Sequence, residues 1–248
     1  MNMTDSNILS IAASVIGGSG LMYLGVKGAL SMIIHGLDPH SMRMKVGAGG
    51  NKKASEYTLY HEIGHVLLNA SFKNIDSSVM VCAFGKQDRN GNLGYAIMQD
   101  TGDMLHTKGL CQWEMLACLS GYMSERFFFG QETMGSGEDR EEWMKSAKLY
   151  LENGFCDGVY YNKPSNDFEF KNNDAQIKAL MVSQEELLER FFAMNTDVVK
   201  DAVSKLAEEG VLSRSMLDEF FERVRFTDDF PIPVIEMMAQ TEEAKKAA

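Results

Sequence analysis

The chain has 248 residues, of which 45% are hydrophobic and 24% are charged, and its formal net charge is −11 at pH 7. This composition is typical of a folded globular protein, with room for one catalytic domain and short appendages. The acidic balance argues against a nucleic-acid-binding protein, which would carry a basic patch or stripe. Four cysteines with no C-x-x-C pair favour a reducing, cytosolic-type compartment over a secreted one.

The first segment, residues 1–34, is unusually apolar. Residues 8–26 contain no charged side chain, and the apolar character resumes after Lys27. This length suits a membrane span, and a buried helical hairpin or a partner-docking segment are the alternatives. As a span it would place the N-terminus outside and the rest of the chain on the cytoplasmic side, because basic residues follow it. A cleaved signal peptide is disfavoured because residues 1–7 carry Asp5 and no basic residue.

Residues 35–54 form a predicted linker, since their glycines, a proline and scattered basic residues resist regular structure. We interpret His35 and His40 within it as solvated. A predicted folded domain follows over residues 55–230, and residues 231–248 are expected to be a short tail.

The domain begins with the motif His61-Glu62-Ile63-Gly64-His65 on a predicted helix capped by Ser55. Positions i and i+4 share one helix face, so both imidazoles can bind one metal ion, and the glutamate between them faces the ion's open side. H-E-x-x-H is the active-site half of a zinc peptidase, in which the glutamate deprotonates the attacking water. The third ligand is left open by the motif. A chance coincidence on an ordinary helix is disfavoured because the chain has only five histidines.

Two β-prone stretches follow, residues 78–84 and 93–98, separated by a turn that contains Asn90-Gly91. They predict a small antiparallel sheet beside the motif helix, and therefore an α+β, mainly α fold. An edge strand there would pair with an extended peptide substrate. A plain structural hairpin is the alternative.

From His106 onward the pattern is helical. Apolar residues at three- and four-residue spacing predict a helix through residue 129, and a Gly-rich turn at 134–137 opens a second helix over 138–150. Residues 153–184 contain glycines, a proline and several asparagines, which predict an ordered loop lining the cleft. Ser183-Gln184-Glu185-Glu186 then resembles a capping box that opens a helix through Phe192.

These landmarks, in this order, resemble the M41 peptidase domain of FtsH-type ATP-dependent zinc proteases. The resemblance rests on the H-E-I-G-H helix, the Leu93-Gly94-Tyr95 strand, Glu125 before an aromatic run and a glycine, and the turn at residues 135–139. It extends into helices at 195–206 and 210–221, and covers roughly residues 55–225.

The resemblance implies that the chain is a zinc metalloendopeptidase. Asp139 occupies the position of the family's third zinc ligand, beside His61 and His65, with Glu62 as the general base. Glu125 is the competing ligand, because many H-E-x-x-H peptidases use a later glutamate; otherwise it supports the ligands indirectly. Leu93, Gly94 and Tyr95 are expected to bind the substrate.

The chain departs from the family in lacking a G-x-x-x-x-G-K-[ST] phosphate loop, so no ATPase module accompanies the peptidase in this sequence. We therefore expect loose or unfolded polypeptide substrates, or an unfoldase or ATPase partner in trans, and a homo-oligomer whose size is open. The alternative function is a catalytically silent, regulatory M41-like module that binds an ATP-dependent protease or its substrates.

Overall fold

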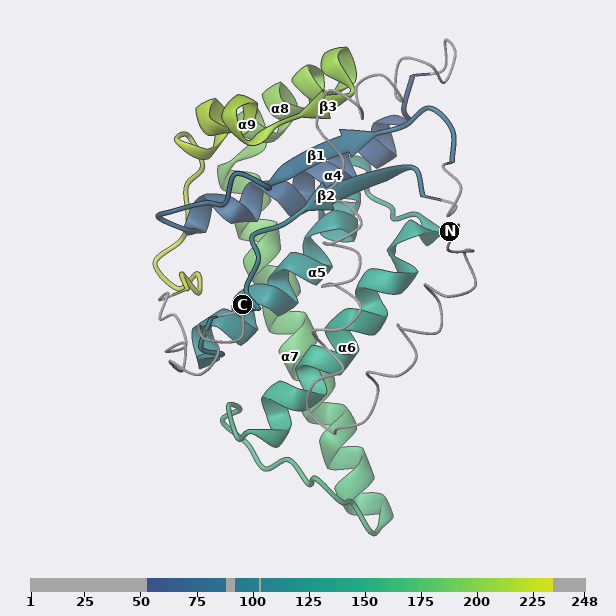
Figure 1. Cartoon of the computed structure of the whole chain (residues 1–248). Coiled ribbons are helices and arrows are strands. Elements are labelled where there is room, and N and C mark those ends of the chain that lie inside the picture. Colours follow the sequence, from purple (N-terminus) through teal and green to yellow (C-terminus); the bar gives the residue numbers. More distant parts are fainter. Residues whose placement is uncertain (1–52, 88–91, 103, 234–248) are drawn as a thin grey trace, which may run out of the picture. The chain divides into compact units, whose positions relative to one another are not determined.

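The computed structural model describes residues 53–87, 92–102 and 104–233 (Figure 1). The apolar segment at 8–34, most of the linker at 35–54, the turn containing Asn90-Gly91 and most of the C-terminal tail lie outside these ranges. Within them, no helix is both long and apolar enough to cross a membrane.

The described part of the chain is mainly helical with one small sheet, which confirms the predicted α+β, mainly α class. The helices are α4 (Glu56–Leu67), α5 (Lys108–Phe129), α6 (Gly137–Glu152), α7 (Asp167–Met194), α8 (Thr196–Glu209) and α9 (Arg214–Phe221), with short 3-10 turns η1 (Leu68–Ser71) and η2 (Met134–Ser136). The strands are β1 (Met80–Ala83), β2 (Gly94–Ile97) and β3 (Val211–Leu212).

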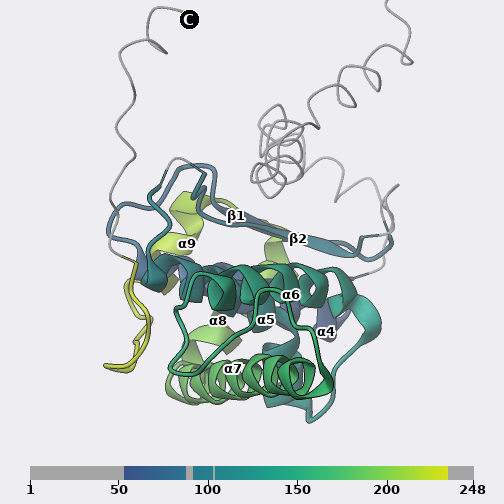
Figure 2. The same ribbon diagram turned by 90° about the horizontal axis from the view of Figure 1, so that it is seen from below.

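The sheet has the order β2-β1-β3, and both pairings are antiparallel. The predicted hairpin forms β1 and β2, with Ala83 opposite Gly94 and Met80 opposite Ile97. The third strand was not predicted, and it pairs Val81 with Leu212. The sheet lies along one side of α4, while α7 lies on the far side of α5 (Figure 2).

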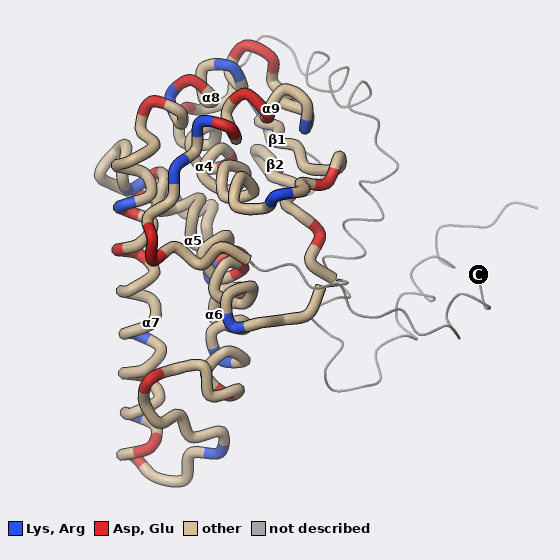
Figure 3. The backbone as a smooth tube through the Cα atoms, turned by 90° about the vertical axis from the view of Figure 1, so that its left-hand side faces the viewer, with Lys and Arg blue, Asp and Glu red and all other residues tan. Residues whose placement is uncertain are grey.

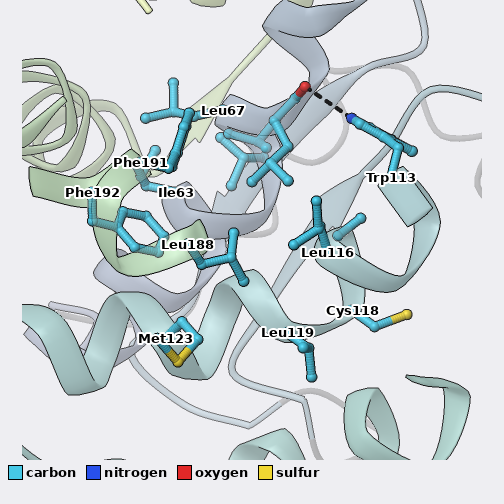
Figure 4. Close-up of a cluster of buried hydrophobic side chains, with 14 of the residues drawn as sticks. Ile63, Leu67, Trp113, Leu116, Cys118, Leu119, Met123, Leu188, Phe191 and Phe192 are labelled. Carbon is cyan, nitrogen blue, oxygen red and sulfur yellow. Dashed lines mark hydrogen bonds between the residues drawn. The ribbon is translucent and has the colours of Figure 1, made fainter. Parts of the chain in front are cut away.

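The hydrophobic core fills the space between α4, α5 and α7 (Figure 4). Ile63 and Leu67 of α4 and Phe191 of α7 are fully buried there. Trp113 of α5 adds its indole ring and donates its Nε1 proton to the carbonyl of Leu68 at 3.3 Å. Because burying one such side chain contributes about 1.5–3 kcal/mol, this cluster holds the motif helix in place.

The predicted loop at residues 153–184 is wrong in its second half, because α7 is one continuous helix of 28 residues from Asp167. Asn166 caps it by accepting from the amide of Glu169. Asparagines such as Asn172 and Asn173 are typical of loops and not of helix interiors. Here their side chains form hydrogen bonds with the backbone of Val159 and Tyr161, so the helix continues through them.

The predicted capping box at Ser183 is likewise wrong, since these residues lie inside α7. Gln184 accepts a hydrogen bond from the Trp143 indole of α6 at 2.7 Å, and Glu185 accepts one from the Tyr122 hydroxyl of α5 at 2.6 Å. The pattern therefore marks the face of α7 that binds α5 and α6. Acidic and basic residues both occur along α7 (Figure 3).

The true loop, residues 153–166, joins α6 and α7 at the tip farthest from the sheet (Figure 1). Asp139 lies in the first turn of α6, and Glu152 ends the helix. At 1.5 Å per residue, this places the loop about 20 Å from Asp139. The prediction that this loop lines a cleft beside the motif helix is therefore wrong.

Helices α4 and α5 approach each other closely at Gly64. A Cβ atom at this position would lie 2.6 Å from the carbonyl oxygen of Ser120 and 2.7 Å from Cβ of Ser124. The motif's glycine is therefore needed for packing, because any side chain would push the two backbones apart.

We predict that Gly64→Ala lowers the free energy of unfolding by about 1–3 kcal/mol, because the overpacking outweighs alanine's better helix propensity. Gly109→Ala is the matched control, since a Cβ at Gly109 in α5 meets no atom within 4 Å. Urea denaturation of both variants measures the difference. Equal stabilities for the two variants would show that the helices can separate without cost.

Candidate metal centre

The two motif histidines lie one turn apart on α4 and point the same ring nitrogen at one place. Ser55 starts the helix by accepting from the amide of Thr58. The Nε2 atoms of His61 and His65 are 3.1 Å apart, and the rings meet edge to face with centroids 4.8 Å apart. The side chains are only 13% and 11% exposed, so both nitrogens are largely shielded from water.

The other nitrogen of each ring is held by an acceptor. His65 Nδ1 lies 2.7 Å from the carbonyl oxygen of Ala117, and His61 Nδ1 lies 2.8 Å from Oε1 of Glu125. A carbonyl accepts only, so Nδ1 of His65 carries the proton, and a carboxylate favours the same for His61. This assignment follows from the partners, and in the neutral imidazoles it leaves both Nε2 lone pairs directed at the shared point.

The rings fit against α5 only because residue 121 is glycine. A Cβ atom at Gly121 would lie 2.3 Å from Nε2 of His65 and 2.6 Å from Nε2 of His61. No motif in the sequence predicted that the imidazoles lie against this glycine.

Asp139 brings a carboxylate to the same point from α6. Its Oδ2 lies 3.3 Å from Nε2 of His61 and 3.3 Å from Nε2 of His65. The side chain is 30% exposed, so this is the side of the cluster open to solvent. Its place in the first turn of α6 suits a negative charge, because a helix N-terminus carries partial positive charge.

The charges of these groups depend on one another. Burial raises the pKa of Asp139, but the neighbouring charge of His65 and hydrogen bonds to His61 and His65 outweigh it and hold the pKa well below its usual range. Burial lowers the pKa of His61, but Asp139 and Glu125 reverse this and raise it to about 10. The cluster therefore attracts a positive charge, either a proton or a metal ion.

Glu125 is not part of this triangle. It is 1% exposed, and it contacts His61 through Nδ1, on the opposite side of the ring from Asp139. Its carboxylate also accepts the amide of Thr133 at 2.5 Å and the Thr133 hydroxyl at 3.1 Å. Thr133 caps η2, directly before α6, so Glu125 links the ring of His61 to the turn that positions Asp139. The role of Thr133 was not predicted, since nothing in its local sequence indicates it.

Glu62 is buried on the neighbouring face of α4, towards β2. A Cβ atom at Gly94 would lie 2.6 Å from Oε1 of Glu62, so the strand passes directly over this carboxylate. Burial raises the pKa of Glu62, while the charges of His61 and His65 lower it, and the net shift is upward. A carboxylate with a raised pKa is better suited to exchange protons near neutral pH.

The predicted substrate-binding residues lie on or beside β2. Within the described residues, β2 pairs with β1 alone and is an edge of the sheet. Leu93 precedes the strand and is 41% exposed, whereas Gly94 and Tyr95 are half-buried and pair with Ala83 and Cys82. Of the three, Gly94 lies next to Glu62.

The donor set fits a zinc ion. A tetrahedral zinc ion with bonds of about 2.0–2.1 Å holds neighbouring ligand atoms about 3.3–3.4 Å apart. The three separations here are 3.1, 3.3 and 3.3 Å, and they involve two imidazole nitrogens and one carboxylate oxygen. Two histidines and one carboxylate form a typical catalytic set, which leaves one position open.

Comparison of the chain with models of known protein families and with curated proteins finds no match. The function is therefore inferred from the geometry of the site and from the motifs.

We predict that Glu125→Ala lowers the free energy of unfolding by about 2–4 kcal/mol, because it removes a buried acceptor and leaves donors of His61 and Thr133 without it. Glu132→Ala is the control, since Glu132 forms an exposed ion pair with Arg140 and is expected to contribute less than about 1 kcal/mol. Chemical denaturation compares the two. Similar losses for both variants would contradict the role assigned to Glu125.

Proposed function

We propose that this chain is a zinc-dependent endopeptidase of the M41-like kind. The observation that carries the proposal is the convergence of His61 Nε2, His65 Nε2 and Asp139 Oδ2 on one point beside the buried carboxylate of Glu62. A site kept only for packing has no need of two imidazoles with their Nε2 atoms turned together, because buried lone pairs without partners cost free energy.

His61, His65 and Asp139 would hold the ion. When bound there, zinc would polarise a carbonyl and lower the pKa of a water molecule. Glu125 and the Ala117 carbonyl keep both imidazoles in the tautomer that a metal requires.

Glu62 acts as the general base and then as the general acid. Its carboxylate takes a proton from the attacking water and passes it to the leaving amine, so that a peptide bond is hydrolysed. Burial beside β2 supports this role, because it raises the pKa of Glu62 towards the range in which a carboxyl both accepts and releases a proton.

The edge strand β2 is the proposed substrate-binding element. An extended peptide paired with its open edge would run past Glu62, held by backbone hydrogen bonds that are the same for every sequence. Only a locally unfolded chain can pair in this way. This supports loose or unfolded polypeptides as substrates.

Other proposals rest on the sequence alone. They are membrane association through residues 8–34 with the peptidase on the cytoplasmic side, an unfoldase or ATPase partner in trans, and assembly into a homo-oligomer.

We predict that Glu62→Gln retains the metal but reduces cleavage of an unfolded, fluorescently labelled casein by at least about 10²-fold, because the proton acceptor is lost. His65→Ala is expected to lose both metal and cleavage. Glu56→Gln is the matched control, since Glu56 is exposed on the same helix and should leave both unchanged. Elemental analysis and a peptidase assay, with and without a chelator, measure the two properties.

Full turnover by Glu62→Gln would rule out this carboxylate as the base. Stoichiometric zinc in the unaltered chain without any cleavage would instead support the regulatory, non-catalytic module.

We also predict that Gly121→Ala loses the metal, because the added methyl group occupies the space of both imidazoles. Gly109→Ala adds the same methyl group to α5 in open space and should keep it. Zinc content is compared after circular dichroism has shown both variants to be folded. A folded Gly121→Ala variant with full zinc content would mean that the ligands lie elsewhere.

A further inference from the structure

A second group of metal-ligating side chains lies at the start of α5. His106 comes just before the capping residue Thr107, and Cys111 and Glu114 follow in the first two turns of the helix. One ligand atom from each of the three residues lies within 4.8 Å of the others. None of the three belongs to the candidate peptidase site.

The helix geometry explains why these residues meet. Cys111 and Glu114 are three positions apart and therefore lie on one face of α5. Thr107 fixes the start of the helix by accepting from the amide of Leu110, and His106 directly precedes this cap. The imidazole Nδ1 lies 3.6 Å from Oε2 of Glu114, and the ring also reaches the thiol of Cys111.

The carboxylate of this cluster is held in place from behind. Glu114 has a side chain only 10% exposed, and its Oε1 accepts the hydroxyl of Thr101 at 2.7 Å. Its second oxygen, Oε2, is left facing His106. This is the arrangement in which a neighbouring donor orients a ligating carboxylate. The side chain of His106 is 42% exposed, so a solvent ion can reach the cluster.

The chemistry of the three donors selects the ion. A thiolate, an imidazole and a carboxylate together suit zinc, whereas calcium and magnesium prefer oxygen alone. Zinc bonds of about 2.0–2.3 Å place such ligand atoms about 3.3–3.6 Å apart. The separation of 3.6 Å between His106 and Glu114 is already close to this range. A simple ion pair between His106 and Glu114 would not require a thiol beside them. Cys111 forms no disulfide, so its thiol is available as a ligand.

We propose that His106, Cys111 and Glu114 form a second zinc site, separate from the H-E-x-x-H centre. Cys111 and Gly121 are ten residues apart on α5, which separates the two sites by about 15 Å along the helix. An ion here ties His106, which precedes the helix, to the first two turns of α5. The proposal does not depend on peptidase activity.

The test uses the full-length chain loaded with zinc and then with cobalt(II). We expect two zinc ions per chain, falling to one in Cys111→Ser and to one in His106→Asn. With cobalt(II) bound, the thiolate of Cys111 should give an ultraviolet charge-transfer band. This band is specific for the second site, because the H-E-x-x-H centre contains no sulfur. Cys156→Ser is the matched control, since its thiol bonds to the Gly158 carbonyl outside the cluster, and it should keep both ions and the band.

His65→Ala separates this proposal from the proposed function. It should lose one zinc ion and keep the thiolate band. A chain that binds a single zinc ion, lost in Cys111→Ser but not in His65→Ala, supports the second site and contradicts the peptidase centre. No thiolate band in the unaltered chain, or a band that persists in Cys111→Ser, overturns the second site.

Discussion

The close approach of α4 and α5 is the constraint on which the rest of the structure depends. Gly64 allows the backbone of α5 to touch α4, and Gly121 allows the two imidazoles to lie against α5. The crossing also brings Glu125 to Nδ1 of His61 and the Ala117 carbonyl to Nδ1 of His65. One contact between two helices therefore sets both the packing of the core and the orientation of the candidate ligands.

Local patterns in the sequence predict those parts of the fold that local interactions determine. Ser55 caps α4, α5 forms where the apolar spacing predicted a helix, and the two β-prone runs form β1 and β2, as expected. The third strand, Val211–Leu212, has no local signal, because it exists only through pairing with β1. Asparagine is typical of loops, yet Asn173 lies inside α7, where two hydrogen bonds to the Tyr161 backbone satisfy its side chain.

In the candidate site, too, local spacing predicts some residues and tertiary packing determines the others. The i, i+4 spacing alone places His61 and His65 together, whereas Asp139 came from a family resemblance and no spacing rule reaches it. Its location next to both Nε2 atoms depends on how α6 packs on α5. The position of Glu125 on Nδ1 rather than Nε2 could not be predicted either, since it depends on which side of the ring each helix passes.

The origin of the three candidate ligands bears on how the chain folds. His61 and His65 belong to one helical turn, but Asp139 follows His65 by 74 residues (139 − 65). A metal ion held by all three would act as a cross-link across this long loop. Closing such a loop costs entropy, and in the folded chain this cost has already been met by folding. Metal affinity would then report on the assembly of α4, β1, β2, α5 and α6 as a unit, and an isolated α4 peptide would bind far more weakly than the folded chain.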